Sequence, residues 1–164
     1  MFIPGIKQFV ENKLEGILLE KINEMEVKIV LSKDKLSSIV PFKKLSNTKA
    51  WKLTSELVRK QSNGICYTCN GFFPFEKLVA GHFIEKIGNA ATYFDLDNLR
   101  AQCMWNCNRM RHGQKDIYAL KLEKEKGYGI IQELHKRASK SKQWMKSELK
   151  ELAEERQKML NEIE

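Results

Sequence analysis

Four cysteines in two close pairs are the residues whose types and spacing point most directly to chemistry. Two residues separate Cys66 from Cys69, three separate Cys103 from Cys107, and the sequence holds no other cysteine. Zinc takes four thiolates in tetrahedral geometry, and a close pair lets one turn supply two of them. The alternatives are four unrelated buried cysteines or two disulfides, and disulfides are rare inside cells. The spacing therefore predicts a structural zinc site. Its four sulfur ligands would leave no coordination position open for a reacting water.

A second set of polar side chains surrounds this predicted site along the chain. His82 lies between the cysteine pairs, Asn98 precedes the second pair, Asn108 follows the last cysteine, and His112 comes four residues later. If a helix begins near residue 106, Asn108 and His112 stand on one face, where an amide oxygen and an imidazole can share a divalent cation. Taken singly, each residue also has an ordinary interpretation. A lone His is usually a surface or core residue, and Asn often occupies a turn or caps a helix.

In chain order these residues give the pattern C-x2-C, G-H-F, D-N-L, C-x3-C-N. The pattern resembles that of the His-Me finger nucleases, also described as HNH-type or ββα-metal nucleases. It is most similar to the phage recombination endonucleases of the NinG family, and it is also similar to Holliday-junction resolvases of the phage endonuclease VII type. The resemblance covers about residues 45–130, including AGHFIEK and DNLRAQCMWNCNRMRHGQ. It implies a metal-dependent DNA endonuclease that cuts branched or recombination intermediates such as Holliday junctions or D-loops.

The resemblance also assigns roles to the second set of residues. His82 would be the general base that deprotonates the attacking water, and Asn98 would orient its imidazole through a hydrogen bond. Asn108 and His112 would ligate a catalytic divalent ion, magnesium or manganese, that stabilises the phosphorane and the leaving oxygen. Many relatives carry a metal-ligating Asp or His directly before the base, whereas this chain has Gly81 there. Water could fill that place, or one of three acidic residues: Glu85, Asp95 and Asp97.

The charge of the chain suits a polyanionic partner. Lys and Arg number 29 against 21 Asp and Glu, which gives a net charge of +8, and such an excess favours nucleic acid. One basic stretch runs over residues 43–60, and another, over residues 99–115, contains no acid. We expect the second stretch to contact the DNA backbone through Arg100, Arg109, Arg111 and Lys115.

Two other functions are compatible with these observations. A zinc-stapled module that binds nucleic acid without catalysis would need the cysteines and arginines but not His82 or Asn108. An inactive structural relative is the third possibility, and it draws on the ligand missing at Gly81.

The elements expected around these residues make an α+β fold that is mostly helical. It comprises an N-terminal extension (1–44), a zinc-containing treble-clef core of the ββα-metal type (45–130) and a C-terminal helix (131–164). Helices are expected over 4–25, 47–61 and 116–126, the second of them capped by Ser46. A short strand is expected over 27–31, and a β-hairpin with arms at 75–83 and 91–96.

The final helix has an apolar stripe near heptad spacing, formed by Met145, Leu149, Leu152, Met159 and Ile163. Such a stripe either packs on its own domain or forms the seam of a homodimer, which would place two sites across a DNA junction. No apolar run approaches the roughly 20 residues that a membrane span needs, and the N-terminus lacks signal-peptide features. We therefore expect a cytoplasmic protein without a membrane partner, in the host cell if a phage encodes it.

Overall fold

The structure is a computed structural model that describes the backbone of residues 4–163 and the side chains of residues 15–30 and 32–163. The chain divides into two units, Met1–Ile39 and Val40–Glu164. All of the predicted site residues lie in the second unit.

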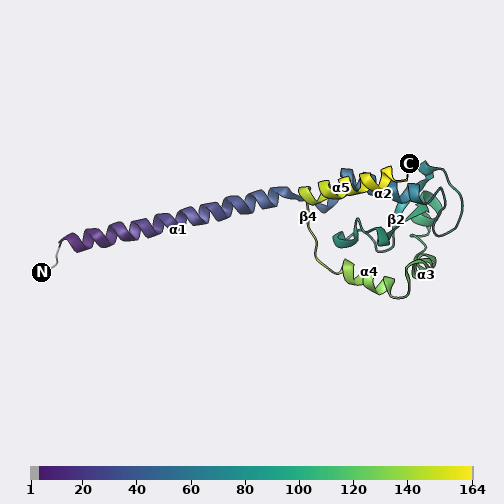
Figure 1. Ribbon diagram of the computed structural model, residues 1–164. Helices are drawn as coiled ribbons and strands as arrows, with labels where there is room; N and C mark the ends of the chain where they lie inside the picture. Colours follow the sequence, from purple (N-terminus) through teal and green to yellow (C-terminus); the bar gives the residue numbers. More distant parts are fainter. Residues whose placement is uncertain (1–3, 164) are drawn as a thin grey trace. The chain divides into compact units, whose positions relative to one another are not determined.

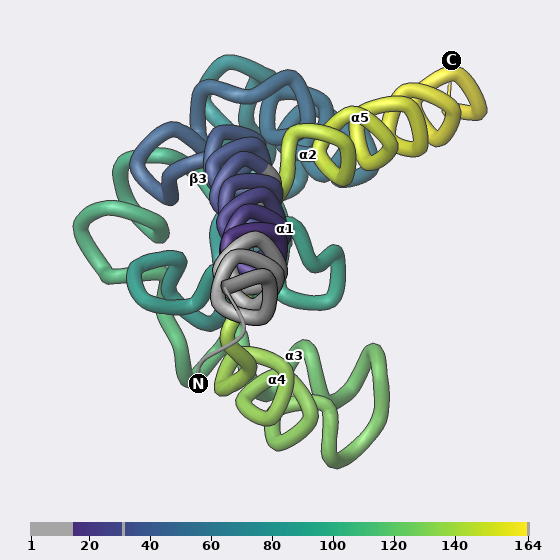
Figure 2. The backbone as a smooth tube through the Cα atoms, turned by 90° about the vertical axis from the view of Figure 1, so that its left-hand side faces the viewer, coloured from purple at the N-terminus to yellow at the C-terminus, as the bar shows by residue number. Residues whose placement is uncertain are grey.

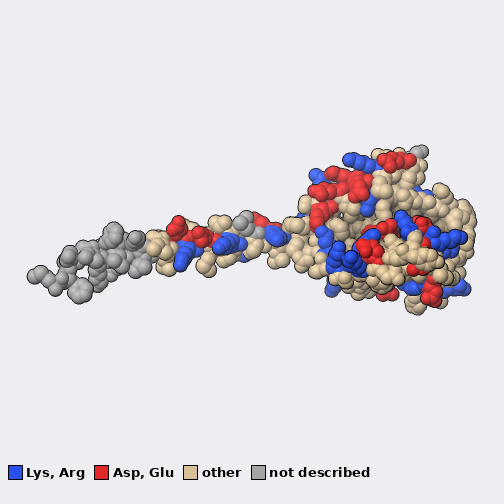
Figure 3. Space-filling model, turned by 60° about the horizontal axis from the view of Figure 1, so that its bottom comes forward, with Lys and Arg blue, Asp and Glu red and all other residues tan. Residues whose placement is uncertain are grey.

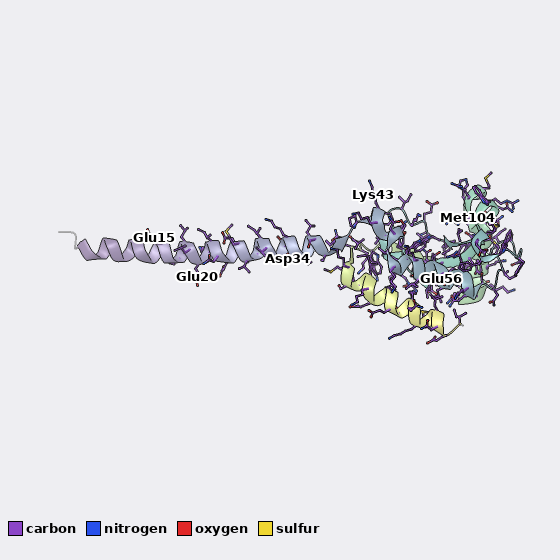
Figure 4. The ribbon with its side chains drawn as sticks, turned by 90° about the horizontal axis from the view of Figure 1, so that it is seen from above. Glu15, Glu20, Asp34, Lys43, Glu56 and Met104 are labelled. Atoms are coloured by element: carbon purple, nitrogen blue, oxygen red, sulfur yellow. The ribbon has the colours of Figure 1, made fainter. Side chains whose placement is uncertain are left out.

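The first unit consists of one helix, α1 (Pro4–Ser38) (Figure 1). The strand expected over residues 27–31 is wrong, because these residues continue the helix. Three alternating apolar residues are too few to separate a strand from a helix, and the Glu, Lys and Met around them favour helix. Side chains stand on several sides of α1, as Figure 4 shows for Glu15, Glu20 and Asp34. The helix expected over 4–25 is confirmed and extends to Ser38; the side chains of residues 4–14 lie outside the described ones.

The second unit is built around two helices that are distant in the sequence but lie side by side, α2 (Lys49–Gln61) and α5 (Lys146–Asn161) (Figure 1). The helix expected over 47–61 is confirmed, but Thr48 rather than Ser46 caps it. The Thr48 hydroxyl accepts a hydrogen bond of 3.2 Å from the backbone of Trp51. Ser46 cannot be the cap because it lies within the 3-10 helix η1 (Phe42–Asn47). The core between α2 and α5 contains Leu45, Leu53, Leu57, Leu149, Ala153 and Leu160.

A two-stranded antiparallel sheet, β2 (Leu78–His82) and β3 (Leu99–Cys103), holds the predicted site. Its register runs from Leu78 opposite Cys103 to His82 opposite Leu99. The second hairpin arm expected at 91–96 is wrong. That stretch contains the 3-10 helix η3 (Ala90–Thr92). Tyr93 and Phe94, which suggested a strand, are instead buried in the α2–α5 core.

Beyond β3 the chain forms a π-helix, η5 (Met104–Met110), and then two helices, α3 (Lys115–Lys126) and α4 (Ile130–Ala138). Helix α3 confirms the helix expected over 116–126. Helices α3 and α4 lie side by side (Figure 2) and bury Tyr118, Leu122 and Leu134. Two further 3-10 turns, η2 (Phe75–Lys77) and η4 (Leu96–Asn98), flank the strands.

The final helix expected over 131–164 is interrupted. Between α4 and α5 the chain leaves the helix and forms the short strand β4 (Trp144–Met145). Another two-residue strand, β1 (Ile39–Val40), lies at the boundary of the two units. The Trp144 indole donates to the carbonyl of Ala90 at 2.9 Å and packs on Phe94. The break lets α4 pack on α3 and α5 pack on α2, which a straight helix could not do.

Three of the five stripe residues pack within this unit: Leu149 is buried, and Leu152 and Met159 contact the α2–α5 core. Met145 lies in β4, and Ile163 is exposed beyond the end of α5. The fold is α+β and mostly helical, as expected. None of the helices in the described chain combines the length and apolarity needed to cross a membrane. On the face seen in Figure 3, basic and acidic side chains are interspersed.

Candidate metal centre and active site

The four cysteines come together as the spacing predicts. Their Sγ atoms all lie within 4.8 Å of one another. Four sulfurs at the usual Zn–S distance of about 2.3 Å stand roughly 3.8 Å apart in a tetrahedron, so the cluster fits a structural metal such as zinc. Cys66, Cys103 and Cys107 are buried and Cys69 is exposed.

Two short segments deliver these thiols. Cys66 and Cys69 lie on a turn after α2 that an isolated bridge between Ile65 and Phe72 closes. The backbone of Cys66 donates to the carbonyl of Gly71 at 2.9 Å. Cys103 ends β3, and Cys107 lies one turn into η5, so the sheet and the π-helix fix the second pair.

Backbone N–H groups already point at the sulfurs. The N–H of Cys103 donates to the Cys66 sulfur at 3.2 Å, and that of Cys107 donates to the Cys103 sulfur at 3.3 Å. Burial alone would raise the pKa of Cys66, but hydrogen bonds from the backbone of Cys69 and Cys103 outweigh it and bring the pKa to about 6. Burial instead raises the pKa of Cys103 and Cys107, so among these three thiols only Cys66 is held as the thiolate, the form that binds zinc.

A pocket of about 310 Å³ brings together three of the four residues of the second set. His82, Asn108 and His112 line it, together with Trp51, Ala80, Glu85, Lys86, Ile87, Gly113 and Lys115. Strand β2 delivers His82 at its last position, and the chain around η5 delivers Asn108 and His112. A histidine and two candidate metal ligands therefore face one cavity.

His82 is held in one tautomer. Its Nε2 lies 3.0 Å from the carbonyl oxygen of Tyr93, and because a carbonyl can only accept, Nε2 carries the proton. In the neutral ring, Nδ1 is then the unprotonated nitrogen. The ring stacks on Trp51 with centroids 5.2 Å apart. Burial, aided by the nearby charges of Lys86 and Lys115, lowers the pKa of His82 to about 4 although the Tyr93 carbonyl opposes it, so the ring is neutral at pH 7.

Asn98 does not reach the His82 imidazole, so the hydrogen bond predicted between them is wrong. Its side chain is fully buried. The Asn98 oxygen accepts from the backbone of Ile84 at 2.6 Å, and its nitrogen donates to the carbonyls of Ile84 and Thr92, each at 3.1 Å. The N–H of Phe83 also donates to the Asn98 carbonyl at 2.8 Å. Asn98 therefore braces the loop that follows the base.

The prediction that Asn108 and His112 stand on one helix face is wrong. The π-helix begins at Met104 (labelled in Figure 4) and ends at Met110, and His112 lies beyond it with a positive φ of 48°. Both residues line the pocket because the chain turns back on itself after η5: the N–H of Gly113 donates to the carbonyl of Cys107 at 2.8 Å. The pocket brings together the residues that the expected helix would have aligned.

Of the three acidic residues considered in place of a ligand at Gly81, Glu85 alone lines this pocket. Asp95 and Asp97 both pair with Arg137, at 3.0 and 2.9 Å, and Asp97 also pairs with Lys126. These ion pairs tie the loop before β3 to α3 and α4.

The four basic residues expected to contact DNA have different environments. The Arg100 guanidinium pairs with both carboxylate oxygens of Glu125, at 2.6 and 3.1 Å. Lys115 donates to the carbonyls of His82 and Phe83, so it supports the end of β2. Arg109 and Arg111 are exposed. The DNA contacts predicted for these residues stay predictions.

Two residues next to the site were not among the candidates predicted from the sequence. Gln102 is fully buried on β3 and accepts a hydrogen bond of 3.2 Å from the Asn108 side chain. Trp105 on η5 is 55 % exposed, and the Arg109 guanidinium lies 4.8 Å from its ring centroid. An exposed tryptophan in an arginine-rich stretch is a signal that the sequence did offer. The role of Gln102 depends on strand register, which no local pattern reveals.

Comparison with known proteins identifies one family. The family model described as bacteriophage lambda NinG protein matches residues 18–164. Neither the curated proteins nor the solved structures include a match to this chain.

Proposed function

Because the chain belongs to the bacteriophage lambda NinG protein family, we propose that it is a metal-dependent DNA endonuclease of the His-Me finger type. One observation carries the proposal: a neutral His82 shares a pocket with Asn108 and His112 beside the four-cysteine cluster. The antiparallel pair β2–β3 followed directly by η5 has the order of a ββα-metal core. The cysteine cluster has no open position, so the chemistry belongs to the neighbouring pocket.

His82 supplies the general base. The proton on Nε2 is committed to the Tyr93 carbonyl, so Nδ1 accepts the proton of the attacking water. The carbonyl also stabilises the imidazolium that forms, because Nε2 then still has its acceptor. Stacking on Trp51 fixes the plane of the ring, and Asn98 fixes the loop behind it.

Asn108 and His112 would hold the divalent ion, magnesium or manganese, with Glu85 close enough to the pocket to join them. An amide oxygen, an imidazole nitrogen and a carboxylate oxygen suit such an ion. When bound, the ion supplies Lewis-acid stabilisation of the charge that develops on the phosphate and the leaving oxygen. Lys115 on the pocket wall adds a fixed positive charge next to the base.

DNA would approach over η5. Arg109 and Arg111 are exposed there with Trp105, and the net charge of +8 favours a polyanion. Arginine contacts to phosphates position the backbone, and an exposed indole can stack on an unpaired base. Selectivity for branched DNA such as Holliday junctions follows from the resemblance. Action as a homodimer is proposed because a junction has two strands to cut, and the final helix or the N-terminal helix could build the dimer.

The test is cleavage of a labelled four-way junction and of a matched linear duplex by zinc-loaded protein, with and without added magnesium. His82→Ala is the test variant, and His135→Ala, an exposed histidine on α4, is the matched control. We expect magnesium-dependent cutting that is lost in His82→Ala and kept in His135→Ala. Omitting chelator in the metal-free arm keeps zinc in place, and zinc content is measured for each sample.

Tight DNA binding without cutting, unchanged by His82→Ala, would refute the catalytic assignment. It would leave a zinc-stapled module that binds nucleic acid, which needs the cysteines and arginines alone. Equal cutting of junction and duplex would keep the nuclease and remove the branched-DNA selectivity.

A further inference from the structure

Asn108 has an amide, and only one end of an amide can bind a cation. The oxygen is a ligand and the NH₂ group is not, so a side chain free to flip would offer the wrong end half of the time. In this structure the Asn108 nitrogen donates to the Gln102 oxygen at 3.2 Å. The Asn108 oxygen therefore lies on the other side of the amide.

Gln102 is itself unable to flip. Its nitrogen donates to the carbonyl of Gly113 at 2.7 Å and to the Thr68 hydroxyl at 3.3 Å. A reversed Gln102 would set its oxygen against the Gly113 carbonyl and its nitrogen against the Asn108 nitrogen. Because the side chain is fully buried, water cannot relieve either conflict.

The glycine before the base makes room for this arrangement. A Cβ at Gly81 would lie 2.2 Å from the Gln102 oxygen and 3.0 Å from the Asn108 nitrogen. Any side chain at position 81 would therefore displace Gln102 from Asn108. Gly81 and Gln102 lie on adjacent strands, β2 and β3, so the pair depends on the sheet register.

The same contacts lead back to the cysteine cluster. The Thr68 hydroxyl lies 3.6 Å from the Cys66 sulfur, and the N–H of Gly113 is held by the carbonyl of Cys107. Both partners that fix Gln102 are thus anchored to the cluster.

We propose that Gln102 is the positioning residue of the catalytic ion site, in the space that Gly81 leaves open, and that it turns the Asn108 oxygen toward the ion. The inference rests on the proposed function. It also explains why position 108 is Asn and not Asp: a carboxylate has no hydrogen to donate to Gln102 and would face its oxygen.

The test measures manganese binding by zinc-loaded full-length protein, using electron paramagnetic resonance of free Mn²⁺, with zinc content determined in parallel. Gln102→Met keeps the side-chain length and removes both hydrogen-bonding ends. Losing a residue that orients a metal ligand typically weakens metal binding about 10- to 100-fold, and we expect such a loss with zinc retained. Gln61→Met, an exposed glutamine at the end of α2, is the matched control and should bind manganese as the wild type does.

A second substitution separates positioning from general structural damage. Asn108→Asp should weaken manganese binding when Gln102 is present. In the Gln102→Met background it should restore most of the binding, because a carboxylate presents an oxygen on either side. If Gln102→Met fails to fold, Gly81→Ala tests the same contact without removing a polar group, and it should also lose manganese affinity while keeping zinc.

Wild-type manganese affinity in Gln102→Met or in Gly81→Ala would overturn the inference, and so would failure of Asn108→Asp to restore binding. If wild-type protein binds manganese and cuts DNA in these cases, the proposed function stands and only the role of Gln102 falls. If zinc-loaded wild type binds no manganese, the proposed ion site fails and takes the inference with it.

Discussion

Replacement of Asn98 by Ala should destabilise the protein before it affects any chemistry. The Asn98 side chain makes three hydrogen bonds, at 2.6, 3.1 and 3.1 Å, all to backbone groups of Ile84 and Thr92. It is fully buried, so the substitution leaves the N–H and the carbonyl of Ile84 without a partner, whereas the Thr92 carbonyl keeps the hydrogen bond of 3.3 Å that it accepts from the backbone of Asp95. At about 1 kcal/mol for each lost bond, we expect the free energy of unfolding to fall by about 3 kcal/mol, a large part of the 5–15 kcal/mol typical of a domain.

The assay is urea unfolding of zinc-loaded protein at pH 7.5, followed by tryptophan fluorescence. Asn89→Ala is the matched control, because Asn89 donates two hydrogen bonds to carbonyls in the same loop but at the surface, and it should change the free energy by less than about 0.5 kcal/mol. Asn98→Asp keeps the bond from Ile84 but loses both donations and buries a carboxylate against the carbonyl oxygens of Ile84 and Thr92, so it should be at least as unstable as Asn98→Ala. The reasoning is refuted if Asn98→Ala unfolds at the wild-type urea concentration while its cleavage is abolished, because Asn98 would then act in the reaction and not as a brace.

Three further outcomes follow from the geometry of the site. Cys107→Ser should lower the zinc content from one ion per chain toward none and cost several kcal/mol of stability; metal analysis and thermal unfolding measure this, and full zinc occupancy would contradict the four-thiolate site. Because burial lowers the pKa of His82 to about 4, the base stays neutral and cleavage should persist down to about pH 5. The folded state should lose stability as the pH falls from 6.5 toward 4, since only the unfolded chain binds the proton in that range. An imidazole titration by NMR with a midpoint near 6.5 would show this to be wrong. Trp105→Ala should weaken binding to a junction with unpaired bases about 5- to 150-fold, from a stacking contribution of about 1–3 kcal/mol, and change duplex binding less. Equal losses on both DNAs in a binding titration would argue against stacking.

The parts of this structure that follow from the sequence are those set by local pattern. The cysteine spacing predicted the cluster, and turn and helix signals predicted α2 and α3. Tyr93 and Phe94 were misassigned to a strand because apolar residues look alike whether a sheet or a pair of helices buries them. Leu99–Cys103, which does form the strand, is recognisable only once the cysteines bring its end to the turn after α2.

The site was predictable by residue type and not by contact. His82, Asn108 and His112 were expected together, and one pocket holds them. The partner of Asn98 was not predictable, since its three bonds depend on a loop closing over it. The contact between Gly81 and Gln102 was not predictable for a related reason. In the sequence, the glycine at position 81 indicates only a missing metal ligand, and the space it leaves for Gln102 depends on the register of the neighbouring strand.

The pairing of α2 with α5 has a consequence for how the chain folds. These helices form the core of the second unit although 84 residues, 62–145, lie between them. Contacts between segments so far apart in the sequence form late and slowly. The cysteine pairs close a shorter loop, so we expect metal binding and the β2–β3 pair to form first, with Leu57 still open to solvent. Until α5 docks, the partly folded protein exposes the apolar face of α2. A tag or truncation that slows this last step should therefore cause aggregation and not loss of zinc.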